Sequence, residues 1–239
     1  MDVRVISIGA LSGNPIWNER GAVRMGHATT TLVRADDATI LVDPGLPAQA
    51  LVARLHERTG LKPSDITHVF LTSFSPECRQ GIAAFESARW LIAEREREAV
   101  GVPLAQGLAR LAESAENALA AGDEPHEDLE ETRRIVEHDV AVLQRCAPAP
   151  DKIAGEVALF PLPGVTPGLC GLLIPGARHT TLIAGDAVPT VDHLEQGKIL
   201  PDCEDREQAQ ESFAEAIEIA DLIVCGRDNI AVNPTRRPF

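Results

Sequence analysis

The stretch ITHVFLTSFSPECRQG, residues 66–81, joins a short apolar segment to a run of small polar residues. Its first part, residues 66–72, has the length and composition of a buried strand. Its second part, residues 73–81, contains Ser, Pro and Gly and predicts a loop. Upstream, Asp43 ends another apolar run and precedes the turn dipeptide Pro44-Gly45. The sequence therefore predicts two strands that each end in a polar turn.

The pattern on either side of this stretch predicts an α/β protein. Strands are expected at residues 3–8, 29–34, 39–43, 66–72, 88–93, 157–162, 171–175, 180–184 and 221–225, and helices at residues 48–58 and 205–220. Two sheets covered by helices fit this order better than a single parallel sheet. The 239 residues are enough for one large domain, which we expect to span residues 1–232. Residues 233–239 are expected to form a loose tail.

The middle of the chain has helical rather than strand periodicity. Two sets of apolar residues recur at helical spacing, namely Leu104, Leu108, Leu111 and Ala115, then Leu129, Ile135 or Val136, Val140 and Leu143. Residues 121–125 contain Gly and Pro and separate the two sets. We therefore predict a helical hairpin, inserted in the domain over about residues 94–148.

The charge and the cysteine content limit the kinds of partner and the classes of protein that fit this sequence. The chain has 36 acidic and 22 basic residues, a net charge of −14, which disfavours nucleic acid and anionic membranes. Five scattered cysteines without a CxxC pair argue against a disulfide framework and a zinc ribbon. The first residues lack a basic segment followed by an apolar run, and no stretch has the length of a membrane span. We expect a soluble, cytoplasmic protein.

Five segments in order carry a resemblance to a known family. They are LVDPG (residues 41–45), ITHVFLTSFSPECRQG (66–81), PLPGVTPG (161–168), LIAGDAV (182–188) and CGRD (225–228). Together they resemble the metallo-β-lactamase superfamily, most closely its glyoxalase II and lactonase-like hydrolases. The resemblance implies an αββα sandwich with two facing mixed sheets, here with an inserted helical hairpin. It also implies an ancestral hydrolysis of esters, thioesters or lactones, with water activated by one or two metal ions, usually zinc.

The metal-binding motifs of that family are altered in this chain. The family carries T-H-x-H-x-D-H after the strand that ends at Leu71. Ser73 and Ser75 stand at the first two His positions, Glu77 replaces the Asp and Cys78 replaces the third His. Serine hydroxyls are weak neutral ligands for zinc, so this half of the site loses its imidazoles.

The remaining ligand positions are also changed. Val165 stands where the family has the His of P-G-H-T-P-G, and Arg227 stands where it has its last His. Only the bridging Asp is kept, as Asp186. Because every His position is substituted, we expect no metal and no other cofactor. The residues that still could ligate one zinc or another divalent metal are Glu77, Cys78 and Asp186.

Arg227 suggests what replaces the metal. Two neighbouring carboxylates, Glu77 and Asp186, would repel each other without a cation. A guanidinium is permanently charged and can bond both of them through its planar fork. We therefore predict an ion-pair cluster of Glu77, Asp186 and Arg227 in place of the metal centre.

Two functions from different classes follow. The first is a non-catalytic binding, regulatory or structural protein, with the helical insert as a candidate homodimer surface. The alternative is a hydrolase with a remodelled site around Glu77, Cys78 and Asp186, either with a single metal or as a metal-free esterase or thioesterase that uses Cys78. If the five segments are chance turn sequences, the structure will lack two facing sheets. The substrate, the ligand and any catalytic residue are unknown from the sequence.

Overall fold

Two six-stranded sheets make up the body of the computed structural model, which describes residues 1–120 and 127–236. The first sheet contains, in spatial order, β1 (Asp2–Ser7), β2 (Thr30–Ala35), β3 (Ala38–Val42), β4 (His68–Leu71), β5 (Arg89–Ile92) and β6 (Ala147–Pro148). The pairs β1–β2 and β2–β3 are antiparallel, and the strands β3 to β6 run parallel to one another. This sheet is therefore mixed.

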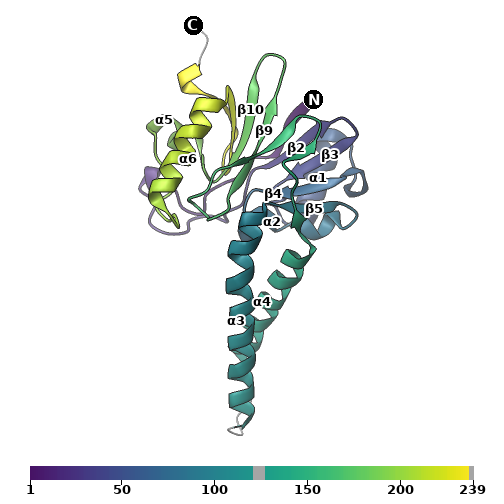
Figure 1. Ribbon diagram of the computed structural model, residues 1–239, viewed down its shortest axis with the longest axis vertical. Coiled ribbons are helices and arrows are strands. Elements are labelled where there is room, and N and C mark those ends of the chain that lie inside the picture. Colours follow the sequence, from purple (N-terminus) through teal and green to yellow (C-terminus); the bar gives the residue numbers. More distant parts are fainter. Residues whose placement is uncertain (121–126, 237–239) are drawn as a thin grey trace.

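The second sheet comes from the C-terminal half of the chain. Its spatial order is β12 (Ile230–Val232), β11 (Leu222–Cys225), β10 (Thr180–Gly185), β9 (Cys170–Pro175), β8 (Val157–Pro161) and β7 (Lys152–Ala154). Only β10 and β11 are parallel, and the other pairs are antiparallel. Figure 1 shows α1 (Ala48–Thr59) on one side of the stacked sheets and α5 (Val191–Gln196) and α6 (Arg206–Ile219) on the other.

The alternation of side chains along each strand explains why apolar layers form on both faces of the sheets. In β2, Leu32 packs in the cluster under α1, whereas the next residue, Val33, packs between the sheets. Both faces of this strand are buried, because successive side chains point to opposite faces. Phe70 and Ile183 meet in the layer between the sheets, and Phe213 of α6 covers the outer face of the second sheet. The predicted αββα sandwich with two mixed sheets is confirmed.

Several short elements were not predicted. The loop expected at residues 73–81 contains a one-turn helix, α2 (Pro76–Arg79), because Pro76 fits the first position of a helix. The helix α5 and the strands β6, β7 and β12 were also missed. Each has two to six residues, too few for a periodic pattern. Four 3₁₀ turns complete the structure: Pro15–Trp17, Pro63–Asp65, Ile82–Phe85 and Pro234–Arg236.

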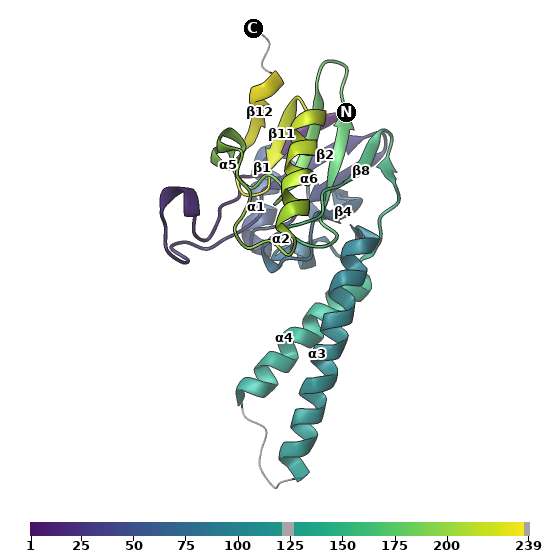
Figure 2. The same ribbon diagram turned by 60° about the vertical axis from the view of Figure 1, so that its left-hand side comes forward.

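The predicted insert consists of two long helices, α3 (Glu94–Ala120) and α4 (Glu127–Arg145), which project from the sandwich (Figure 2). The break predicted at residues 121–125 lies outside the described residues. Val142 and Leu143 of α4 join the cluster under the first sheet. Apolar packing therefore fixes the base of the insert to the body.

The C-terminal segment is tied to the body as far as the structure describes it. Asn233, expected at the start of a loose tail, is fully buried, and its amide donates to the carbonyls of Ile217 and Ala220. The short turn Pro234–Arg236 follows it. The last residues of the predicted tail, 237–239, lie outside the described residues.

Candidate functional site

The predicted site residues follow strands that end at the same edge of the two sheets. Asp43 follows β3 and Ser73 follows β4, while Asp186 follows β10 and Arg227 follows β11. Because β3 and β4 are parallel, and so are β10 and β11, their carboxyl ends lie together. Residues more than 180 positions apart in the sequence thus face one another.

Two glycines bring Asp186 and Arg227 into contact. Gly185 ends β10 with φ +55°, in the left-handed region that favours glycine. Gly226 packs so closely against the backbone of Gly185 that a Cβ atom there would overlap it. The residues that follow these glycines are therefore held side by side.

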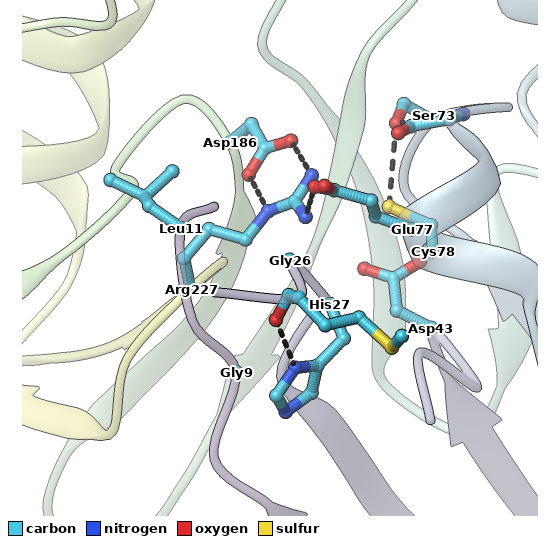
Figure 3. Close-up of polar contacts among 12 residues, drawn as sticks. Gly9, Leu11, Gly26, His27, Asp43, Ser73, Glu77, Cys78, Asp186 and Arg227 are labelled. Atoms are coloured by element: carbon cyan, nitrogen blue, oxygen red, sulfur yellow. Dashed lines mark hydrogen bonds and ion pairs between the residues drawn. The ribbon is translucent and has the colours of Figure 1, made fainter. Parts of the chain in front are cut away.

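Arg227 bonds both carboxylates of the predicted cluster (Figure 3). Its Nε donates to Asp186 Oδ1 at 2.7 Å and its Nη2 donates to Asp186 Oδ2 at 2.6 Å. Its Nη1 donates to Glu77 Oε2. The side chains of Arg227 and Asp186 are 4% and 9% exposed, and that of Glu77 is 34% exposed. The predicted ion pairs of Arg227 with Glu77 and Asp186 are present.

The charge on Arg227 is held firmly. Burial on its own would lower its pKa, but the charge of Asp186 and the hydrogen bonds to it outweigh burial and raise the pKa above its ordinary value. The guanidinium therefore stays protonated throughout the pH range of a folded protein.

The loop before β2 covers the cluster. Gly26 packs against the Glu77 carboxylate so tightly that any side chain at this position would overlap it. Ala28 N donates to the carbonyl of Glu77 at 2.9 Å, and Thr29 N donates to that of Gly226 at 2.7 Å. A cavity of about 140 Å³ remains beside Arg227, bordered by Trp17 and Arg24 among others. This volume is below the roughly 300–1,000 Å³ of ordinary ligand pockets.

Asp43, at the end of β3, lies beneath this region. Its carboxylate accepts hydrogen bonds from Thr72 N at 2.8 Å and from Thr72 Oγ1 at 2.7 Å. Burial raises the pKa of Asp43 to about 7, and the hydrogen bonds from Thr72 offset only part of this rise. Asp43 is therefore a carboxyl group that titrates near neutral pH inside the protein.

Cys78 and Ser73 contact each other, with 3.5 Å between Cys78 Sγ and Ser73 Oγ. Cys78 is almost fully buried, and burial and the neighbouring Asp43 raise the pKa of its thiol well above the ordinary value. The thiolate is the nucleophilic form of cysteine, so this environment opposes reactivity. Ser75, half-buried, donates its backbone N–H to Ser73 Oγ at 3.4 Å.

Val165 is not part of the cluster. Its side chain packs with the apolar residues on the outer side of the second sheet. Gly164, at φ +130°, lies directly against the backbone of Ala209 in α6. This close contact holds the loop against α6, and Val165 contributes to the apolar layer beneath that helix.

Comparison with known proteins gives the same architecture. A family model for the metallo-beta-lactamase superfamily matches residues 23–72 and ends just before Ser73. The fold is that of the metallo-β-lactamase superfamily. The resemblance predicted from the five segments is thereby confirmed. No curated protein matches the sequence significantly.

Three solved structures illustrate the metallo-β-lactamase fold. A Thermotoga maritima protein assigned provisionally to the metallo-β-lactamases is 17% identical, with a TM-score of 0.63 over 97% of this chain and 98% of its own. A variant of AiiA from B. thuringiensis, with N-decanoyl-L-homoserine at its active site, is 18% identical, with a TM-score of 0.59 over 91% and 86%. The dizinc quorum-quenching lactonase AidC is 18% identical, with a TM-score of 0.57 over 80% and 67%.

The residues present do not fit the zinc ions typical of metallo-β-lactamases. Arg227 occupies both oxygens of Asp186 and one of Glu77 with its own donors, so those ligand atoms face a cation. Within residues 1–120 and 127–236, no three His, Cys, Asp or Glu side chains are grouped so that they could hold a metal. The geometry supports a structural ion-pair cluster instead.

Two buried charged residues next to the site were not predicted. Glu96 accepts hydrogen bonds from Phe74 N at 2.9 Å, Thr166 Oγ1 at 2.7 Å and Gly168 N at 3.1 Å. Arg79 donates to Asp139 of α4 at 2.9 Å. Both residues connect the helical insert to the loops of the site. Nothing in the sequence pointed to either residue, because both stand among other charged residues. An acid in the first turn of a helix, such as Glu96, is ordinarily solvated.

His27 and Trp17, in the covering loop, do not reach the two carboxylates through any hydrogen bond. The His27 ring contacts the carbonyls of Ile8 and Met25, and Trp17 Nε1 donates to Asp192 at 2.7 Å. Trp17 is 58% exposed and lies at the rim of the small cavity. Its hydrogen bond ties the loop to α5.

Replacing Arg227 by Ala should lower the free energy of unfolding by about 3 kcal/mol, because it leaves Asp186 buried without its counter-charge. Urea unfolding followed by circular dichroism measures this change. The control is Arg20→Ala, since Arg20 is exposed and its removal should cost within about 0.5 kcal/mol. Equal stability of the two variants would show that the cluster does not stabilise the fold.

Asp43 predicts a pH dependence of stability. Because its pKa rises from 3.8 in the unfolded chain to about 7 in the fold, the folded state alone keeps this proton between pH 4 and 7. The contribution of Asp43 to the free energy of unfolding is therefore fully present below pH 4. It is lost as the pH rises through 7, by at most about 1.4 kcal/mol per pH unit. In Asp43→Asn this contribution disappears, so the stability difference between variant and parent should change steadily from pH 4.5 to 7.5. A difference that is constant over this range would refute the assignment.

Proposed function

We propose that this chain is a non-catalytic protein of the metallo-β-lactamase fold, with a binding, regulatory or structural role. The observation that carries the proposal is the bidentate contact of Arg227 with Asp186, extended to Glu77. It places a fixed cation among the acidic side chains that would have to bind a metal. Hydrolysis by metal-activated water needs open coordination positions on a cation that the site can hold.

Access to the cluster supports the same proposal. Gly26 packs on Glu77, and the side chains of Arg227 and Asp186 are nearly inaccessible. The cavity of about 140 Å³ next to Arg227 is smaller than a pocket for an acyl or lactone substrate would need to be. We infer that Arg227 and Asp186, which are nearly inaccessible, act on the stability of the fold and not on a substrate.

The proposal includes a cytoplasmic location. All five cysteines are free, as expected in a reducing compartment. Among the helices that the structure describes, none is long and apolar enough to cross a bilayer.

Metal analysis tests the proposal directly. Protein purified without chelator and without a metal-affinity step should contain far less than one zinc, manganese or iron per chain. Added zinc should also leave the melting temperature unchanged, because a site filled at about 100 times its Kd would stabilise the fold by about 2.7 kcal/mol. Asp186→Asn is the control that assigns any metal found to the cluster. A near-stoichiometric metal that this variant loses, together with zinc-dependent lactone or thioester hydrolysis, would overturn the proposal.

The Cys78 alternative has its own measurement. Iodoacetamide applied to the folded protein at pH 7.5 should leave Cys78 unmodified, since its thiol is buried and protonated. Mass spectrometry of peptides compares it with Cys203, which is only partly buried and serves as the internal control. In denaturant both should react. Rapid alkylation of Cys78 in the folded protein would instead favour a metal-free thiol esterase.

A further inference from the structure

A cavity outside the ion-pair cluster lies where the covering loop meets α5 and α6. Its volume is about 280 Å³, close to the lower end of the range for ligand pockets. Pro15 and Ile16 of the covering loop border it on one side, and residues of the segment 197–201, which follows α5, border it on another. It shares no lining residue with the cluster of Glu77, Asp186 and Arg227.

The lining of this cavity is basic, although the chain as a whole carries a net charge of −14. Lys198 and Arg206 border the cavity, and none of the described Asp or Glu residues does. Neither cation has an ion-pair partner in the described part of the chain. Lys198 Nζ donates to the neutral amide oxygen of Gln196 at 2.8 Å. The cavity is therefore a local positive region on an acidic protein.

The acids nearest in the sequence do not neutralise these cations. Asp192 accepts a hydrogen bond from the indole of Trp17 at 2.7 Å, and Asp205 accepts a backbone N–H in the first turn of α6 at 3.0 Å. Asp202 and Glu204 are exposed and do not border the cavity. The two cations thus lack a counter-charge within the cavity itself.

His193 adds a buried donor to the same cavity. This residue is 1% exposed, and its Nδ1 lies 2.8 Å from Thr190 Oγ1, which also accepts the backbone N–H of His193 at 3.3 Å. The Thr190 hydroxyl proton has no other acceptor among the described residues, so we assign it to Nδ1, and the ring proton is then on Nε2. Nε2 has no hydrogen-bond partner in residues 1–120 and 127–236 and is not fully enclosed, so it opens on the cavity that His193 borders.

The charge balance indicates the class of ligand. Burial lowers the pKa of His193, so its ring is a neutral donor at neutral pH, and the cavity holds the two positive charges of Lys198 and Arg206. A phosphate monoester carries a charge of about −1.5 to −2 near pH 7 and has three strong acceptor oxygens. A carboxylate has one negative charge and would leave one cation unbalanced. Guanidinium and ammonium groups both bind phosphate well.

We propose that this cavity binds a small organic phosphate monoester. Lys198 and Arg206 hold its phosphate, the Nε2–H of His193 donates to a phosphate oxygen, and the apolar part of the ligand lies against Ile16 and Pro201. Because the cavity is separate from the Arg227 cluster, this site goes beyond the proposed function.

Isothermal titration calorimetry of the full chain with phenyl phosphate, near neutral pH, measures the binding. Phenyl phosphate combines the phosphate with an apolar ring, and we expect a Kd of about 1 mM or below. Inorganic phosphate and benzoate each lack one part of this ligand and should bind at least about tenfold more weakly. All titrations are made at equal ionic strength, because salt screens non-specific attraction to exposed cations.

Two variants assign the binding to this cavity. Lys198→Gln and Arg206→Gln change exposed residues, so the fold should tolerate them, and each should raise the Kd for phenyl phosphate at least about fivefold. Arg178→Gln is the matched control. It removes the same charge from an exposed position between β9 and β10 that does not border the cavity, and should leave the Kd unchanged.

NMR of the imidazole Cε1–H signals tests the part of His193 without a variant of this buried residue. The signal of His193 should shift as phenyl phosphate saturates the site. The signal of His179, which is exposed between β9 and β10, should stay in place and is the internal control.

Absence of binding at about 10 mM phenyl phosphate, or a Kd that both Lys198→Gln and Arg206→Gln leave unchanged, would overturn the proposal. Benzoate that binds as tightly as phenyl phosphate would refute the assignment to a phosphate. Release of phenol during the titration would contradict the proposed non-catalytic function and not the binding site. Neither the Kd nor the NMR shift bears on the metal analysis, so failure of this site and failure of the proposed function are distinguishable.

Discussion

Arg227 and Asp186 meet where two parallel strands of one sheet end, and the side chain of Glu77 reaches them from α2, which follows β4 of the other sheet. Two carboxylates this close together repel each other unless a cation lies beside them, whether that cation is a metal ion or a side chain. In this chain the cation is covalently part of the protein, so it can neither dissociate nor offer a coordination position to water. The rest of the region is arranged around that contact. The loop with Gly26 closes over Glu77, and the glycines at 185 and 226 hold the two strand ends together.

Hydrogen bonds and an ion pair connect the site to the helical insert. Glu96, at the start of α3, bonds Phe74 in the loop after β4 and Thr166 and Gly168 in the loop after β8. Arg79 of α2 bonds Asp139 of α4. The loops that would carry metal ligands in this fold are thus held by buried polar contacts to the insert. A structural role for these loops agrees with the proposed function.

The fold persists although the family's histidine ligands are replaced, because the packing of the layers and the binding of a metal depend on different residues. Three apolar clusters, one between the sheets and one on each outer face, stabilise the sandwich. None of them requires a metal ligand. Substitutions at the strand ends can therefore replace imidazoles by hydroxyls, a thiol and a guanidinium while the layers stay packed, which is why fold alone does not establish function.

The sequence by itself determined the order of the longer strands and helices, which follows from residue type and spacing. The family resemblance implied the two mixed sheets and brought Glu77, Asp186 and Arg227 to one site, and their charges then predicted the ion pairs. Only the tertiary structure decided that Val165 turns to the outer layer, that the Cys78 thiol is protonated and that Glu96 is buried. It also decided the short elements α5 and β12. The physical reason is that the direction of a side chain and its distance from water depend on which distant segments pack against it, and neither is encoded in periodicity.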